Sequence, residues 1–246
     1  YLCSLHGTNQ LYRNLGQWRF EPMPLGEAAC LGQMSTGALL VDVDGDADLD
    51  LLVNGIAAGT RLFLNDGHGR WTEKRDSGLY RHTTGTSMAL ADMDGDGDLD
   101  LYCVHYIDVM HMIDPSTRFA MSQQGGRWVV SQVNGIPTTD PRFRDRFEVM
   151  PDGEVVELPE ADALYRNDGH GRFTPVQAEP GVFLDDQGKP EPMTRDWGLA
   201  VVFRDLDGDG SADLYVSNDF ASPDRLWFND GRGHFRAAPP QTLRHA

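Results

Sequence analysis

The sequence contains three short acidic segments in which carboxylates alternate with small or apolar residues. The most regular of them is Asp92-Met-Asp-Gly-Asp-Gly-Asp-Leu-Asp100, with five aspartates in nine residues. Carboxylates this close repel one another strongly unless a cation lies among them. Ca²⁺ takes about six to eight oxygen ligands at about 2.3–2.6 Å, and a tight loop of alternating carboxylates supplies such ligands. The segment therefore predicts a calcium-binding loop.

The same pattern occurs twice more, in Asp42-Val-Asp-Gly-Asp-Ala-Asp-Leu-Asp50 and in Asp205-Leu-Asp-Gly-Asp-Gly-Ser-Ala-Asp213. Three copies make chance a poor explanation, so we predict up to three bound Ca²⁺ ions. In the central copy the expected side-chain ligands are Asp92, Asp94, Asp96 and Asp100, and Asp98 is expected to offer its backbone carbonyl. The candidate ligands of the other copies are Asp42, Asp44, Asp46, Asp48 and Asp50, and Asp205, Asp207, Asp209, Ser211 and Asp213.

Two features of these loops leave alternatives open. The first copy has Ala47 where the others have glycine, which predicts strain of roughly 1 kcal/mol at that turn. Calcium is favoured over magnesium by the number of oxygen atoms, but the spacing alone does not separate the two ions. The alternative for all three copies is a solvated acidic turn that binds no metal.

The segments beside the acidic loops decide which kind of metal site is expected. They are short apolar runs such as Leu101-Tyr-Cys-Val104, which indicate buried strands. An EF-hand begins with the same D-x-D-x-D-G pattern, but helices flank it and a glutamate closes it at the twelfth position. Here the twelfth position holds Val53, Cys103 and Val216, which excludes an EF-hand.

A second motif recurs along the chain, and its clearest copy is Leu62-Phe-Leu-Asn-Asp-Gly-His-Gly-Arg-Trp71. Asn-Asp-Gly between strand-like runs is a strong hairpin signal. Further copies lie at residues 11–20, 164–173 and 226–235, and the first of these lacks Asp-Gly and predicts a different turn. The aromatic residues before and after each turn are expected to be cross-strand core residues.

Together the two motifs give a module of strand, acidic loop, strand, connection, strand, turn and strand. All-β repeats of about fifty residues indicate the four-stranded antiparallel blades of a β-propeller. We therefore predict a single propeller domain over residues 1–246 with fewer than four complete blades, so that the ring is either incomplete or completed by residues absent from this sequence. Its parts are a partial blade at 1–21, a blade at 35–75, a blade at 85–175 that contains an insertion at 106–162, and a blade at 197–237.

Composition restricts the partners of the chain. The sequence has 38 acidic and 21 basic residues and a formal charge of −17, which argues against nucleic acid as a partner.

No apolar run approaches the ~20 residues of a membrane span. The sequence has no initiator methionine and no signal-peptide pattern at Tyr1, so we expect a processed or partial chain.

The long insertion at 106–162 is unusual, because connections of this length are uncommon unless they have a function. We expect it to carry a surface for a protein partner, and the alternative is a lid over the blade edge. A further possibility is that the chain is a subunit of a larger membrane-associated assembly and is held there by the insertion. The open edges of an incomplete ring favour such a cover.

The sequence shows no catalytic motif of the G-x-S-x-G, H-E-x-x-H or phosphate-cradling kind, so we expect a protein that is not an enzyme. The alternative is a carbohydrate-active or lyase-type propeller with a site near the insertion. That alternative predicts that His105, Asp108 and His111 converge in a pocket with a perturbed carboxylate. His68 and His170, in their Asn-Asp-Gly-His-Gly turns, are expected to be exposed.

The acidic loops, followed by Asp-Leu-Tyr-Val and then Leu-Tyr-Arg-Asn-Asp-Gly-x-Gly-x-Phe, resemble FG-GAP/VCBS repeats. Asp213-Leu-Tyr-Val-Ser-Asn-Asp219 is similar in particular to bacterial relatives of cartilage acidic protein, which are associated with an ASPIC/UnbV domain. The resemblance implies an integrin-α-like propeller with Ca²⁺ on one rim. It also implies a periplasmic or secreted location and a role in adhesion and protein–protein interaction. Ala47, and an insertion without cysteines, depart from the family pattern.

Overall fold

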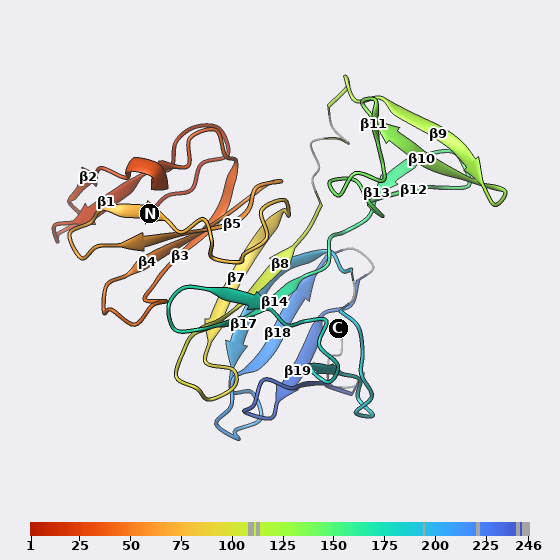
Figure 1. Ribbon diagram of the computed structural model, residues 1–246. Helices are drawn as coiled ribbons and strands as arrows, with labels where there is room; N and C mark the ends of the chain where they lie inside the picture. The colour runs from red at the N-terminus through yellow and green to blue at the C-terminus, as the bar shows by residue number, and fades with distance from the viewer. Residues whose placement is uncertain (108–110, 112–113, 194, 220–221, 240–241, 243–246) are drawn as a thin grey trace.

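The computed structural model describes the whole chain except residues 108–110, 112–113, 194, 220–221, 240–241 and 243–246. The described residues form β-strands together with a short 3-10 helix, η1 (Gly26–Ala29), and the prediction of an all-β protein is confirmed. Three large sheets follow one another along the chain, and an insertion forms smaller sheets of its own (Figure 1). In the described part of the chain, no helix combines the length and the hydrophobicity that a membrane span requires.

The first large sheet is antiparallel and follows chain order. Its strands are β3 (Ser35–Val41), β4 (Asp50–Gly55), β5 (Gly59–Asn65) and β6 (Trp71–Glu73). One face of this sheet is covered by the N-terminal segment, which contributes Leu11 and Leu25 to a shared core. In that segment β1 (Leu11–Asn14) pairs with β2 (Phe20–Met23), and Leu2 bridges Gln10.

The second and third large sheets repeat this pattern with differences. The second contains β7 (Gly85–Ala91), β8 (Asp100–His105), β14 (Ala163–Asn167) and β15 (Phe173–Pro175). The third contains β17 (Gly198–Arg204), β18 (Asp213–Asn218), β19 (Arg225–Asn229) and β20 (Phe235–Ala237). A fifth strand, β16 (Phe183–Leu184), adds to this sheet in parallel with β20.

The fifth strand departs from the expected unit of four antiparallel strands, and aromatic packing accounts for it. The ring of Phe183 stacks on that of Phe235 with centroids 5.5 Å apart, and it also meets Trp227 edge-on. Both phenylalanine side chains are at least 97% buried, with exposed fractions of 3% and 0%. Burial of Phe183 draws its segment onto the edge of the third sheet, where it pairs in parallel with β20. The sheet therefore contains both parallel and antiparallel strands.

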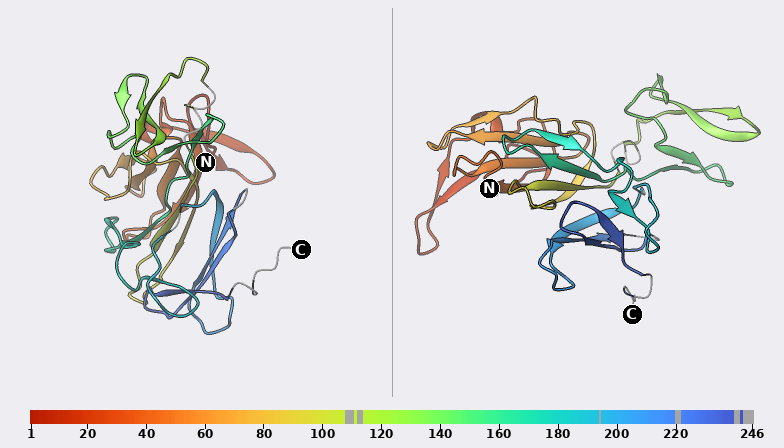
Figure 2. Two further views of the ribbon diagram at one scale, coloured as in Figure 1. Left: turned by 90° about the vertical axis from the view of Figure 1, so that its right-hand side faces the viewer. Right: turned by 60° about the horizontal axis from the view of Figure 1, so that its bottom comes forward.

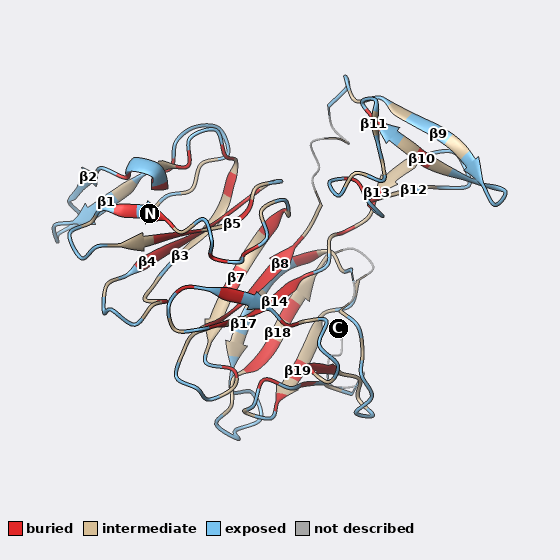
Figure 3. Ribbon diagram, in the orientation of Figure 1, coloured by how far each residue is buried: buried red, intermediate tan, exposed pale blue. Residues whose placement is uncertain are grey.

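Strand β8 shows why the sequence needs continuous apolar runs. Leu101 and Cys103 lie in the core between the first and second sheets. Tyr102 and Val104 lie in the core between the second and third. A strand that is buried on both faces has no polar side, and buried residues accordingly concentrate in these central strands (Figure 3). The first strands of successive sheets lie beside each other, β3 next to β7 and β7 next to β17.

The aromatic residues around the hairpin turns behave as expected in three of the four copies. Phe63, Phe173 and Phe235 have exposed fractions of 0%, 2% and 0%. In the first copy the expectation is wrong, because Trp18 is 93% and Phe20 is 52% exposed. Strands β1 and β2 form a two-stranded sheet, and Trp18 lies in the turn between them with φ = 61°.

The insertion forms two small antiparallel sheets with a core of their own. One contains β9 (Phe119–Gln124), β10 (Arg127–Val133) and β11 (Ile136–Pro137), and the other contains β12 (Phe147–Val149) and β13 (Val155–Glu157). Val133 and Phe143 are central to the core that joins them. The insertion leaves from the end of β8 and returns at the start of β14, and it stands apart from the large sheets (Figure 2).

Topology places the insertion and the acidic loops at opposite ends of the large sheets. The central acidic loop enters β8 at Asp100, whereas the insertion follows His105 at the other end of that strand. Six strand residues span about 20 Å. The connections that precede β7 and β17 lie at the same end as the insertion, because these strands run from there toward their acidic loops.

Candidate metal sites

Each acidic segment forms the hairpin loop between the first two strands of a large sheet, β3–β4, β7–β8 or β17–β18. In every loop three carboxylates come together so that one oxygen of each lies within 4.8 Å of the others. That spacing suits a single shared cation. The three groups are Asp42, Asp44 and Asp50; Asp92, Asp94 and Asp96; and Asp205, Asp207 and Asp213. The remaining candidates lie in the same loops outside these groups: Asp46, Asp48, Asp98, Asp100, Asp209 and Ser211.

The first aspartate of each loop holds the turn in shape. The Asp92 carboxylate accepts hydrogen bonds from the backbone N–H groups of Gly95 at 2.8 Å and Gly97 at 3.1 Å. Asp42 and Asp205 make the same pair of bonds in the other loops. Local bonding of this kind is typical of aspartate at turns and explains why the pattern begins with this residue.

The last aspartate of each loop connects the loop to the third strand of its sheet. Asp50 is 0% exposed, and its carboxylate accepts the N–H of Val43 at 3.1 Å and that of Asn65 at 2.9 Å. Asp100 and Asp213 have equivalent partners. Burial raises the pKa of Asp50 and of Asp100 to about 6, because the charged form of each carboxyl loses its contact with water.

The third position of two loops carries a carboxylate oxygen whose hydrogen-bonding capacity is unused. Asp44 Oδ1 and Asp94 Oδ1 are buried and have no hydrogen-bond partner among the described residues. Burial of a charged oxygen without a donor is costly. In each of these two loops, a cation held between the carboxylates would satisfy the unpartnered oxygen, so the residues present fit a bound divalent ion.

The turn at Ala47 has the backbone conformation expected of glycine. Ala47 has φ = 72°, and the matching residues Gly97 and Gly210 have φ values of 95° and 92°. The Ala47 N–H still donates to Asp42 Oδ2 at 2.9 Å. The first loop therefore keeps the common shape at a cost of about 1 kcal/mol for the left-handed alanine.

An arginine that the sequence patterns did not identify adjoins the central loop. Arg166 Nε donates to Asp94 Oδ2 at 2.7 Å. The residues at the matching place in the first and third sheets are Leu64 and Phe228, which carry no charge. Arg166 lies on β14, beyond the insertion, so its contact with residue 94 becomes visible only in the folded chain.

Asparagines of the hairpin motif were also missed as loop partners. Asn167 Nδ2 donates to the Val43 carbonyl at 2.8 Å, and Asn229 Nδ2 donates to the Met93 carbonyl at 2.9 Å. Each bond runs from one sheet back to the acidic loop of the preceding sheet. Asparagine recurs just before the turn in all four copies of the hairpin motif, and this recurrence could have identified Asn167 and Asn229 as structurally important.

The histidines that an enzymatic site would use lie in different surroundings. His105 is 1% exposed, burial lowers its pKa to about 4, and its Nδ1 lies 2.7 Å from the Ala161 carbonyl. His111 lies edge-on against Phe143 with centroids 5.2 Å apart. Asp108 lies outside the described residues. His68 and His170 are exposed, as expected.

Asp162 is the perturbed carboxylate of this region, and it is buried together with its partners. It is 6% exposed and accepts hydrogen bonds from the His105 N–H at 2.8 Å and the Tyr102 hydroxyl at 3.0 Å. Burial raises its pKa to about 7. Both of its oxygens are therefore used to hold the root of the insertion against β8.

Comparison with known protein families gives a match to one part of the chain. A model of the FG-GAP-like repeat matches residues 42–103, from the first aspartate of the first loop into β8. No curated protein gives a significant match to the chain. The matched segment contains two complete acidic loops, and the chain is therefore similar to FG-GAP-like repeat proteins in the region that forms its first two candidate metal sites.

Proposed function

We propose that the three large sheets are successive blades of an integrin-α-like propeller. The support is their common strand order, the adjacency of their first strands and the shared cores between consecutive sheets. On this interpretation the N-terminal segment is the outer part of a further blade, and β16 is an addition to the last one. The insertion then lies on the rim opposite the acidic loops.

We propose further that each acidic loop binds one Ca²⁺. The observation that carries this proposal is the buried, unpartnered Oδ1 of Asp44 and of Asp94 inside a group of three carboxylates. A bound dication would neutralise the carboxylates and fix the hairpin between the first two strands of the blade. The residues that would hold it are those of the three groups, with the remaining loop oxygens as further ligands.

The function that best fits these features is that of a non-enzymatic interaction or scaffold propeller outside the cytoplasm. Within the FG-GAP-like class, the residues around Asp213 favour the type related to cartilage acidic protein. The insertion offers a surface for a protein partner, because Trp128 is 56% and Met150 is 39% exposed beside one cleft between its two hairpins. Tryptophan and methionine are enriched where proteins meet.

The calcium proposal is tested by thermal unfolding in calcium and in chelator. We expect a higher melting temperature in Ca²⁺, because the ion binds only the folded loops. Asp94→Ala and Asp207→Ala should each weaken Ca²⁺ binding by isothermal titration. Asp152→Ala should not, because Asp152 lies in an exposed turn of the insertion, outside the acidic loops, where its carboxylate accepts the Glu154 N–H at 3.0 Å. Equal effects of all three variants, or one melting temperature in both buffers, would contradict the proposal.

A further inference from the structure

A basic cleft lies at the junction of the insertion and the large sheets. Segments far apart in the sequence line it: residues 80–83 before β7, Pro141, Arg144 and Arg146 in the insertion, residues 160–161 on its return, and Arg195 before β17. Its volume is about 300 Å³, which is the lower end of the range for small-molecule sites. Four of its lining residues are arginines in a chain whose net charge is −17.

Two of these arginines have no carboxylate partner within the described residues. Arg144 Nη2 donates to the Thr139 carbonyl at 3.3 Å, and Arg195 Nη1 donates to the Asp145 carbonyl. Both side chains are exposed. A guanidinium has five N–H donors, so each arginine retains several donors for a ligand. Carboxylate, phosphate and sulfate groups match this fork of donors.

The other two arginines are fixed in place by glutamates. Arg146 is 8% exposed, and its Nη2 lies 2.5 Å from Glu157 Oε1 and 3.0 Å from Glu160 Oε1. Glu160 Oε2 also accepts the Thr84 N–H at 2.6 Å, which ties the insertion to the start of β7. The wall of the cleft that contains Arg146 is therefore held by buried contacts rather than by mobile surface side chains.

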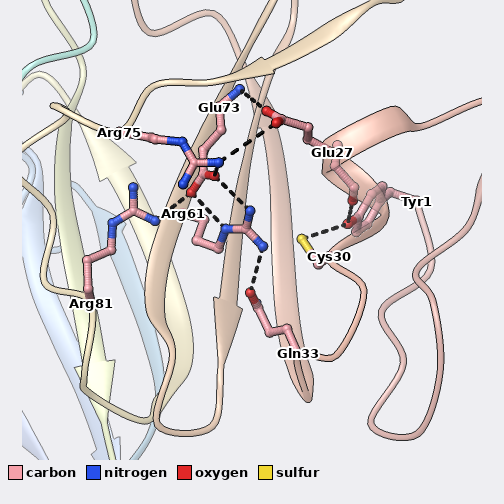
Figure 4. A network of polar contacts seen from close by, with 9 residues as sticks. Tyr1, Glu27, Cys30, Gln33, Arg61, Glu73, Arg75 and Arg81 are labelled. Atoms are coloured by element: carbon pink, nitrogen blue, oxygen red, sulfur yellow. Dashed lines mark hydrogen bonds and ion pairs between the residues drawn. The ribbon is translucent and has the colours of Figure 1, made fainter.

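Arg81 connects the cleft to a second cluster of arginines. Arg81 Nη1 lies 2.7 Å from Glu73 Oε1, but Glu73 also pairs with Arg61 at 2.9 Å and with Arg75 at 3.1 Å (Figure 4). One carboxylate thus pairs with three guanidinium groups, and the nearby Glu27 carboxylate lies 3.7 Å from Arg75 Nη2. The charge of Arg81 is incompletely balanced on this side of the cleft.

The acidic loops do not cancel this positive charge. They lie at the other end of the large sheets, about 20 Å away along the strands. The Debye length at physiological ionic strength is about 8 Å, so exposed charges at that separation are largely screened from each other. An anion in the cleft would experience the local arginines and little of the net charge of the chain.

We propose that this cleft binds a small ligand that carries a multivalent oxyanion. Arg144 and Arg195 contact the oxyanion directly, and Arg81 supplies positive charge from one wall. Arg146, whose charge is balanced by Glu157 and Glu160, shapes the opposite wall. Arg144 comes from the insertion and Arg195 from the connection that precedes β17, so the ligand bridges these two segments. This site is independent of the acidic loops and of any ion bound there.

The test uses sulfate and succinate as probes on the full chain, with Ca²⁺ held constant. Both are dianions that bind calcium weakly, and one is tetrahedral whereas the other presents carboxylates. Each dianion is titrated into the protein by calorimetry, and a titration with sodium chloride at equal ionic strength serves as the blank. The comparison removes the effect of ionic strength on the heat signal. We expect saturable binding of at least one dianion to a single site. The dianion that binds more tightly identifies the oxyanion that the cleft prefers.

Arg144→Ala/Arg195→Ala should weaken that binding at least about tenfold, since charged hydrogen bonds of this kind are worth about that much each. The matched control is Arg118→Ala/Arg127→Ala. It removes the same charge from exposed sites elsewhere in the insertion, where the Arg118 guanidinium donates to the Pro115 and Thr117 carbonyls. Affinity of the control should stay within about twofold of the parent. Absence of saturable binding by both dianions, or equal losses in the two variants, would overturn the proposal.

Discussion

Arg166 Nε lies 2.7 Å from Asp94 Oδ2, so the central acidic loop already has a cation beside one of its candidate ligands. The corresponding residues of the other sheets are apolar, and only this loop has such a neighbour at that place. A positive charge at this distance competes with a bound dication. The three loops should consequently differ in affinity although their sequences are nearly alike.

Replacing Arg166 by leucine, the residue at the matching place in the first sheet, should raise the Ca²⁺ affinity of the central loop about tenfold. The measurement is a Ca²⁺ titration in a background with Asp44→Ala and Asp207→Ala, which isolates that loop. Arg172→Leu is the control, because Arg172 pairs with Asp76 at 2.7 Å outside the acidic loops. An unchanged or lower affinity in Arg166→Leu would show that the arginine supports the site instead of competing with the ion.

Ala47→Gly should stabilise the chain by about 1 kcal/mol, since glycine adopts φ = 72° without the steric cost that alanine has there. The matched change, Gly97→Ala at φ = 95°, should destabilise it by at least as much. Urea unfolding in chelator measures both variants without a contribution from bound metal. Changes of the same sign in the two variants would show that the turn conformation does not control the stability of these loops.

Asn167→Ala should lower the free energy of unfolding by about 1–3 kcal/mol, because it leaves the buried Val43 carbonyl without this donor. Asn65→Ala is the comparison, because its side chain donates to the exposed Leu49 carbonyl of its own sheet at 3.1 Å. Water can replace that bond, and the loss should be smaller. If the two variants unfolded at the same urea concentration, the bond between sheets would add nothing to stability.

Glu73 makes stability depend on pH in the acidic range. Its side chain is 2% exposed, and the bonds from Arg61 and Arg81 lower its pKa from 4.5 to about 2. A carboxyl group whose pKa is lower in the folded state stabilises the fold above pH 4.5 and loses that contribution as pH falls toward 2. A shift of this size corresponds to about 3 kcal/mol.

Glu73→Gln tests this relation by urea unfolding between pH 7 and pH 2. At pH 7 the variant should be less stable than the parent, since Gln cannot pair with the arginines as an anion. The difference between the two proteins should shrink as pH falls from about 5 to 2, because the parent glutamate becomes protonated over that range. A difference that stays constant with pH would refute the assigned pKa. The control is Glu21→Gln. Glu21 pairs with Arg13, and both side chains are exposed, so this variant should hardly change the free energy of unfolding at any pH.

The sequence predicted the all-β fold because its signals are local. Aspartates such as Asp92 bind the N–H groups of their own loop, and the Asn-Asp-Gly turns close hairpins between neighbouring strands. The same locality explains the hairpin at Gly125 and Gly126 between β9 and β10. In each case the residues that define the pattern are also the ones that contact one another.

The features that the sequence did not reveal depend on contacts between distant residues. Arg166 and Asp94 are 72 positions apart, and the whole insertion lies between them. The parallel pairing of β16 arises from the stacking of Phe183 on Phe235, which no short-range pattern encodes. The basic cleft likewise requires Arg144 and Arg195, which are far apart in the sequence, to line one cleft at the junction of the insertion with the sheets.

The asparagine bonds from one sheet to the preceding acidic loop have a consequence for how the molecule responds to damage. Asn167 and Asn229 each donate a hydrogen bond to the acidic loop of the sheet before their own, so each of these bonds joins two adjacent sheets. In linear arrays of this kind, stability is the sum of the units and of the interfaces between adjacent units. Loss of one acidic loop should therefore destabilise the sheet that follows it more than the sheets farther along the chain.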